Sequence, residues 1–214
     1  MKKATGTRDA TWRRKELAVL AQLASPSAIQ GFLDEVPYSA DPFYRCPRRV
    51  LADRKAHCFD GALFAAAALR RMGHPPVLLD MRAVRDDDHV IAVFKQHRCF
   101  GAVAKSNFVG LRFREPVYRS LRELVMSYFE DFFNELGEKT LRAYSSLLDL
   151  RHFDALGWEW GDDAAEHIAA ALDCARHFRL VTRDQERGLS RLDRRSFEGG
   201  TLGINRAGLY KVRD

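Results

Sequence analysis

The stretch HCFDGALFAAAALRRMGHPPVLLD, residues 57–80, decides how this chain folds. From Cys58 to Leu69 almost every residue is apolar, and a helix that is apolar on all sides is normally buried at the centre of a protein. Two arginines, a glycine and two prolines follow in the order that usually ends a helix. We therefore predict a central buried helix that begins at Cys58.

The segments around this helix predict an α+β fold. Three strands separated by short turns are predicted at 76–84, 89–95 and 99–106, which favours a small antiparallel sheet packed on the helix. Extra helices are predicted toward both ends of the chain, at 9–24, 27–36, 48–53, 116–136 and 162–178, and a loop or hairpin at 197–212. We expect a single domain over 1–214, with a helical N-terminal part (1–46), a catalytic-type core (47–136) and a C-terminal extension (137–214).

The composition narrows the classes of partner. Apolar residues make up 46% of the chain and charged residues 30%, as in ordinary globular proteins. The net charge of +6 raises the question of nucleic acid, but acidic residues are interspersed along the chain and no binding motif is present. Nucleic acid is therefore not an expected partner. No apolar run is long enough to span a bilayer, so a membrane is not expected either.

The cysteines indicate a reducing compartment. Cys46, Cys58, Cys99 and Cys174 lie too far apart for a zinc ribbon and need not be paired. The basic N-terminus is followed by an apolar stretch that polar residues interrupt, which favours an amphipathic helix over a signal peptide. We predict a cytoplasmic protein with no metal and no cofactor. All the cysteines except Cys58 are interpreted as packing residues.

Cys58 is the candidate nucleophile. A thiol reacts as thiolate, and the free N–H groups at the start of a helix lower its pKa. The small residues behind Cys58 would hold its backbone rigidly. Its own N–H could then stabilise the negative oxygen that forms when a carbonyl is attacked.

His89, at the head of the strand 89–95, is the candidate acid and base. A cysteine nucleophile needs an imidazole that accepts the thiol proton and later protonates the leaving amine. A strand beside the central helix would bring His89 to Cys58. His57 is the neighbour of Cys58 in sequence, but adjacent residues on a helix point about 100° apart, so we expect it to be the weaker base.

Together these residues resemble the core of the transglutaminase-like superfamily, a branch of the papain-like cysteine enzymes. Members of that superfamily have a catalytic cysteine at the start of a buried helix and an acidic residue two positions later. They also have a Gly-x-Pro type of helix exit and a histidine that opens the next strands. Cys58, Asp60, Gly73 with Pro75, and His89 match these positions one by one.

The third catalytic residue departs from the superfamily pattern within the similar segment, which covers about residues 47–107. The superfamily usually has an Asp on the next strand to orient the histidine, whereas this chain has GAVAKSN at 101–107. Asn107 could hold the His89 ring as a papain-like asparagine does, and Ser106 could do so more weakly. Alternatively, Asn107 is a turn residue that ends the strand.

The resemblance implies acyl transfer at an amide or ester carbonyl of a peptide or small-molecule substrate. Cys58 would form a thioester, and His89 would act as acid and base. Water as second substrate would make the protein an amidase or peptidase, and an amine would make it an acyltransferase; both stay open. The alternative is a catalytically inactive binding or scaffolding module on the same core, which the missing Asp favours.

Overall fold

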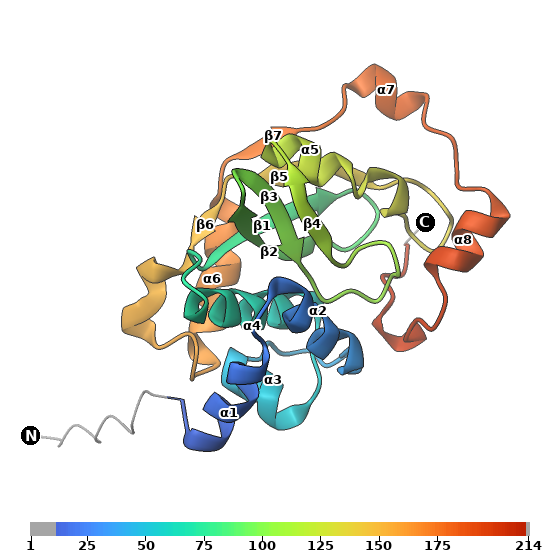
Figure 1. Cartoon of the computed structure of the whole chain (residues 1–214). Coiled ribbons are helices and arrows are strands. Elements are labelled where there is room, and N and C mark those ends of the chain that lie inside the picture. Colours follow the sequence, from blue (N-terminus) through green and yellow to red (C-terminus); the bar gives the residue numbers. More distant parts are fainter. Residues whose placement is uncertain (1–11, 213–214) are drawn as a thin grey trace, which may run out of the picture.

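The computed structural model describes residues 12–212 of the 214-residue chain and has a mixed α+β fold (Figure 1). The helices are α1 (Arg14–Gln22), α2 (Pro26–Glu35), α3 (Pro47–Asp53), α4 (Cys58–Arg71), α5 (Leu121–Met126), α6 (Asp163–Cys174), α7 (Arg183–Arg187) and α8 (Arg194–Gly200). The strands are β1 (Val77–Ala83), β2 (His89–Gln96), β3 (Cys99–Val103), β4 (Arg114–Tyr118), β5 (Leu141–Ser145), β6 (Leu148–Asp149) and β7 (His177–Arg179). Short 3-10 helices are η1 (Phe129–Asp131), η2 (Leu150–Leu156) and η3 (Arg206–Gly208).

The strands form one antiparallel sheet. The three strands predicted after the central helix correspond to β1, β2 and β3, which pair in that order. The sheet continues on both sides, with the order β4-β3-β2-β1-β5-β7 and with β6 paired to β1. Strands β5, β6 and β7 come from the C-terminal extension, so this extension completes the sheet rather than standing apart from it.

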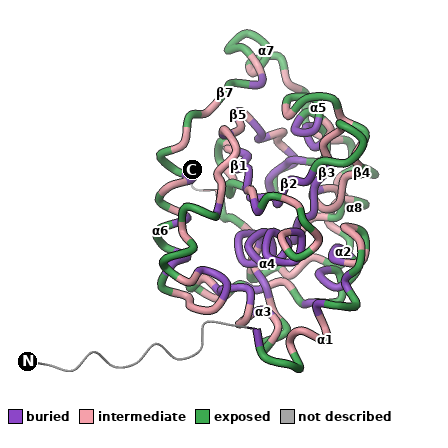
Figure 2. The backbone as a smooth tube through the Cα atoms, turned by 60° about the vertical axis from the view of Figure 1, so that its left-hand side comes forward, coloured by how far each residue is buried: buried purple, intermediate pink, exposed green. Residues whose placement is uncertain are grey.

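Helix α4 is buried along nearly its whole length and packs against β2 on one face of the sheet, as predicted for the central helix (Figure 2). Successive strand residues alternate between two hydrophobic clusters. Leu78 and Ala92 belong to the cluster around α4, whereas Leu79 and Ile91 belong to the cluster on the other face, which includes side chains of α5. Because both faces are covered, the middle of β2, residues 90–94, is apolar at every position.

Behind Cys58, helix α2 and helix α4 both pack closely against the segment that follows β3. A Cβ atom at Gly61 would lie 2.2 Å from the Lys105 Cβ, so only glycine fits where α4 passes the end of β3. Lys105 is buried, and its Nζ donates to the carbonyl oxygens of Leu33 (2.8 Å) and Val36 at the end of α2. Burial lowers the pKa of Lys105 to about 8. Helix α2, helix α4 and the segment after β3 are therefore held together.

The single helix predicted at 116–136 is wrong. This segment forms the end of β4, the short helix α5 and the 3-10 helix η1. Ser120 starts α5, because its Oγ accepts the Glu123 N–H at 3.1 Å. The three pieces all turn apolar side chains toward the same face of the sheet, so their apolar spacing imitates that of one long helix.

The ends of the chain also differ from the predictions. The predicted helix 9–24 corresponds to α1, and its first residues lie outside the described residues. The predicted helix 162–178 ends at Cys174, and the chain then joins the sheet as β7. The predicted loop or hairpin at 197–212 is wrong where it includes the end of α8 and η3.

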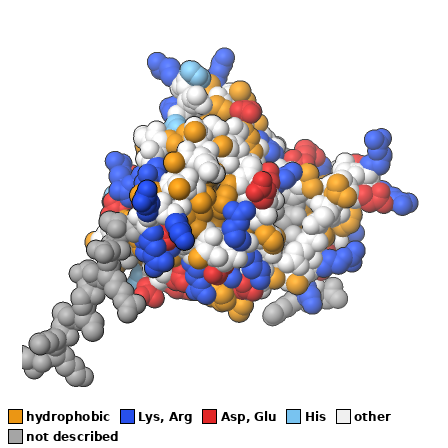
Figure 3. Space-filling view, turned by 60° about the horizontal axis from the view of Figure 1, so that its bottom comes forward, with side chains coloured by type: hydrophobic (Ala, Val, Ile, Leu, Met, Phe, Trp, Pro, Cys, Tyr) orange, Lys and Arg blue, Asp and Glu red, His pale blue; other side chains and the backbone are white. Residues whose placement is uncertain are grey.

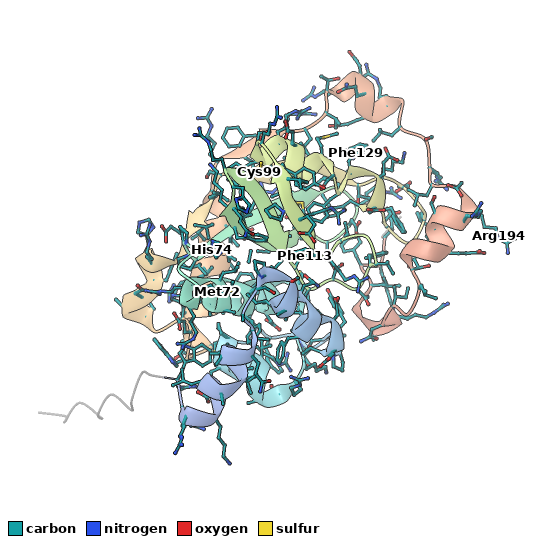
Figure 4. The ribbon with its side chains drawn as sticks, viewed as in Figure 1. Met72, His74, Cys99, Phe113, Phe129 and Arg194 are labelled. Atoms are coloured by element: carbon teal, nitrogen blue, oxygen red, sulfur yellow. The ribbon has the colours of Figure 1, made fainter. Side chains whose placement is uncertain are left out.

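The C-terminal arm leaves the sheet after β7 and runs around the periphery. Helices α7 and α8 lie at the outside of the molecule, and Arg194 points away from it (Figures 1 and 4). Neither helix contains a buried residue. Within residues 12–212, no helix is both long and apolar enough to cross a membrane.

Candidate active site

The start of α4 is fixed by a buried carboxylate. Asp60 Oδ2 accepts the His57 N–H at 3.0 Å, and its Oδ1 accepts the Arg45 N–H at 2.8 Å. Asp60 is completely buried, so these charge-assisted bonds hold the turn that precedes the helix. Cys58 is the first helical residue, and its N–H consequently has no acceptor within the helix. This N–H is a free donor beside the thiol.

His57 contacts the sulfur, although helical spacing predicted that it points about 100° away from Cys58; that it is the weaker base stays a prediction. It caps α4 with an extended backbone (φ −80°, ψ 173°), so its ring turns back toward Cys58 rather than pointing away as on a helix. Its Nδ1 and Nε2 lie 3.5 and 3.8 Å from the Cys58 Sγ. Nδ1 also accepts the Phe59 N–H at 3.4 Å, which is a long hydrogen bond. A protonated Nδ1 would instead donate to the negatively charged sulfur, and this charge-assisted bond is the stronger of the two.

His89 reaches the same sulfur from the sheet. It is buried at the start of β2, opposite Met81 of β1. Its Nε2 donates to the Leu111 carbonyl oxygen at 2.9 Å, which fixes the tautomer and leaves Nδ1 free to exchange a proton. His89 lines the same cavity as Cys58 and helps to lower the pKa of that thiol. The structure thus brings together the two residues that the sequence analysis paired.

Asn107 and Ser106 do not orient His89, which corrects the sequence prediction. The Asn107 amide instead pairs with the backbone of Asn205, and the Ser106 Oγ accepts the Phe108 N–H at 3.0 Å. The orienting group is the Leu111 carbonyl, which no sequence motif identifies. A carbonyl is neutral, so it holds the ring but stabilises an imidazolium less than an Asp would.

The charges around the sulfur favour an ion pair. Burial acts to raise the pKa of Cys58, but the positive charge and hydrogen bond of His57, with contributions from His89, lower it to about 5. The negative sulfur raises the pKa of His57 to about 9 against the opposing effect of burial, and Asp60 and Asp87 add to this rise. Thiolate and imidazolium therefore coexist near neutral pH.

Tyr38 is a further site residue that the sequence analysis missed. The segment before α3 pairs with the segment before α4 through a bridge between Tyr38 and Ala56, which places the Tyr38 ring 5.7 Å from the His57 ring. Burial, the negative charge of Cys58 and a hydrogen bond with it raise the pKa of Tyr38. The hydroxyl consequently keeps its proton and is a donor beside the sulfur.

The site opens into a cavity of about 40 Å³, far smaller than the roughly 300–1,000 Å³ of ordinary ligand pockets. Gly208 and Tyr210 of the C-terminal segment belong to its wall. The remaining lining residues come from the loop before α3, the start of α4, the acidic turn before β2 and the segments after β3 and α5: Tyr38, Cys58, Asp86, Asp87, Asp88, His89, Ser106, Asn107, Phe108, Leu111 and Phe132. The chain itself covers Cys58, which is only 5% exposed.

A metal site or a nucleic-acid surface would need other groupings among the described residues. Among residues 12–212 there is no cluster of His, Cys, Asp and Glu that could hold a metal ion, and Cys99 lies at the start of β3 (Figure 4). On the face that Figure 3 shows, basic side chains lie beside acidic ones. Elsewhere in the described residues, Arg49 pairs with Asp162 and Arg70 with Asp154.

In comparisons with known proteins, no family model and no curated sequence matches this chain.

Proposed function

We propose that this protein is a cysteine-dependent acyl-transfer enzyme of the transglutaminase-like type. The observation that carries the proposal is a Cys58 sulfur at the start of a buried helix, 3.5 Å from the His57 imidazole and in the same cavity as His89, which also lowers its pKa. A packing cysteine needs no imidazole, whereas a nucleophilic one requires a base and a cation. The α+β arrangement, with the cysteine helix packed on the strand that carries the histidine, is consistent with this superfamily.

The proposed reaction gives each group a defined step. The Cys58 thiolate attacks an amide or ester carbonyl, and the oxygen, which becomes negative, accepts the Cys58 N–H. His89, which carries on Nδ1 the proton lost by the thiol, protonates the departing amine or alcohol, and a thioester remains on the sulfur. Water or an amine then attacks the thioester, with His89 accepting its proton. His57 serves to hold the thiolate before attack, since its raised pKa depends on the negative sulfur.

Trapping the acyl-enzyme tests this proposal. The assay uses p-nitrophenyl acetate with the wild-type chain and with Gly208→Leu, because a side chain at position 208 would push the covering segment from the site. We expect a burst of one p-nitrophenolate per chain in Gly208→Leu and a slower burst in wild type. Peptide mapping should locate the acetyl group on Cys58. Adding an amine and comparing the amide and acetate released would show which second substrate the site prefers.

Two controls separate chemistry from background. Cys58→Ala should abolish the burst in both chains, and Cys46→Ala should leave it unchanged. The competing function is a noncatalytic binding module, which the closed cavity over Cys58 favours. That alternative predicts no burst and no acetyl group on Cys58 in either chain, and such a result would reject the enzyme proposal. For the cellular compartment we keep the cytoplasm as a proposal, because all four cysteines are free.

A further inference from the structure

The segment Asn205–Tyr210, here called the strap, is bound across the candidate site through its backbone. The Asn107 side chain pairs with both peptide groups of Asn205: its Oδ1 accepts the Asn205 N–H at 2.8 Å, and its Nδ2 donates to the Asn205 carbonyl at 2.9 Å. The same Nδ2 lies 3.4 Å from the Gly208 carbonyl oxygen. Asn107 thus recognises a polypeptide backbone, a role that the sequence analysis did not foresee.

The side chain of Asn205 fixes the shape of the strap. Its Oδ1 accepts the Ala207 N–H at 3.1 Å, which starts the 3-10 turn η3, and its Nδ2 donates to the Tyr38 carbonyl at 3.1 Å. Three residues later, a Cβ atom at Gly208 would lie 2.8 Å from the Tyr38 ring and 3.6 Å from the Asn107 Nδ2. The site therefore accepts a turn with asparagine at its start and no side chain at the position facing Tyr38.

The strap is held by few contacts, although the site beneath it is buried. No residue between 201 and 212 is buried, and Leu202 is 76% exposed. After Leu180, the arm that leads to the strap, including α7 and α8, also buries no residue. Segments with little buried surface open at low free-energy cost, whereas α4 and β2 open only with the whole fold. The strap is therefore the part of the site that can leave.

A substrate must take the place of the strap, because a cavity of about 40 Å³ holds no substrate. The groups that would be uncovered are the Asn107 amide, the Tyr38 carbonyl and the Cδ1–Cε1 side of the Tyr38 ring, which now contact the strap. Clefts of about 220 and 430 Å³, each partly lined by Phe108, flank the strap and offer room for a longer chain.

We infer that the strap occupies the position of a polypeptide substrate, and that the site takes a polypeptide turn of the form Asn-x-x-Gly, with the glycine against Tyr38. This inference rests on the proposed function and specifies its substrate class, a polypeptide rather than a small-molecule amide. The strap is tethered, so it competes with a free polypeptide at a high effective concentration.

A binding experiment without the thiol tests the inference independently of the chemistry. The full-length chain carries Cys58→Ala, and a fluorescent peptide with the sequence of residues 204–210, Ile-Asn-Arg-Ala-Gly-Leu-Tyr, is titrated by anisotropy. Adding Gly208→Leu should displace the strap and tighten peptide binding at least about tenfold, since the competing closed state is removed. The matched control is Gly199→Leu in α8, where a Cβ meets nothing within 4 Å; it should bind the peptide as the parent does.

Two further measurements fix the specificity. A peptide with leucine in place of its glycine should bind at least about tenfold more weakly to the opened chain, because its side chain meets the Tyr38 ring. Asn205→Ala, which removes the bonds to Tyr38 and Ala207, opens the strap by a second route if Gly208→Leu fails to fold.

Equal binding of the glycine and leucine peptides, or no binding to any folded opened variant, would overturn the inference. The acyl-enzyme assay on Cys58 reports separately on the proposed function, so the two can fail independently.

Discussion

Two buried cysteines stand at the starts of neighbouring helices and have opposite acidities. Cys46 caps α3 and is 3% exposed, and Cys58 begins α4 and is 5% exposed. Burial raises the pKa of Cys46 to about 12, with Asp162 adding to the rise, whereas the pKa of Cys58 falls to about 5. Position at a helix start and burial are shared, so neither can explain the difference.

The difference lies in the charge placed beside each helix start. At α3 the Cys46 N–H donates to the Asp162 Oδ1 at 2.8 Å, so a carboxylate already satisfies this end of the helix. At α4 the neighbours of the sulfur are the imidazoles of His57 and His89. In these two buried sites the helix start lowers the thiol pKa only where a cation accompanies it, because the desolvation of the buried thiolate otherwise dominates.

The largest predicted effect is selective alkylation. In a chain with Cys99→Ser and Cys174→Ser, iodoacetamide at pH 6.5 should modify Cys58 at least about a hundredfold faster than Cys46, because only Cys58 is a thiolate there. Intact-mass spectrometry with peptide mapping measures both rates. The rate at Cys58 should rise with pH through about 5 and then level off, whereas an ordinary thiol rises near 8.5. Comparable rates at the two cysteines would contradict the opposite pKa shifts on which the comparison depends.

The next prediction separates the roles of His57 and His89 at the sulfur. His57→Gln removes the main positive charge that acts on Cys58. The midpoint of the alkylation profile should therefore rise by at least about one pH unit, and the rate at acidic pH should fall roughly tenfold or more. His89→Gln should move this midpoint less, since His89 contributes less to the lowered pKa. It should nevertheless abolish turnover of the acyl-enzyme. Equal shifts from the two variants would refute this division.

The central helix and the first three strands could be predicted from the sequence because their burial leaves a continuous apolar pattern. The region after β3 could not, since Pro116 lies in the edge strand β4 and the following apolar residues belong to separate short elements. Strand β7 has only three residues and no pattern of its own. Its pairing with β5 depends on the sheet that is already formed.

The site was predictable in part for a related reason. Cys58 and His89 are marked by their positions at the starts of a helix and a strand. His57 was underrated because the angular argument assumed helical backbone, whereas a helix cap is extended. The Leu111 carbonyl and the backbone of the strap have no side-chain signature, so the orienter of His89 and the partner of Asn107 emerge only from the structure.

The third effect compares the carboxylates at the two helix starts. Asp60→Asn should lower the free energy of unfolding by about 2 kcal/mol, because an amide NH₂ would replace an oxygen that accepts the N–H of His57 or Arg45 in a fully buried position. Asp162→Asn, at the start of α3, should cost less, since the Asp162 side chain is 31% exposed and solvent can compensate. Urea unfolding monitored by circular dichroism measures both. A larger loss from Asp162→Asn would show that the start of α3, and not that of α4, is the more strongly fixed.

The smallest effect concerns the packing that holds Cys58 in place. Gly61→Ala would put a Cβ 2.2 Å from the Lys105 Cβ, so α4 or the segment after β3 must shift, at a cost of about 1–2 kcal/mol. Gly31→Ala in α2 is the matched control: its Cβ meets nothing within 4 Å, and the helix should gain about 0.5–1 kcal/mol. For a chain of this size, the melting temperature should fall by about 2–8 °C in the first variant and rise by about 1–4 °C in the second. If Gly61→Ala melts no lower than wild type, the close contact does not fix the start of α4. The low pKa of Cys58 then does not depend on this contact to hold the helix beside His89.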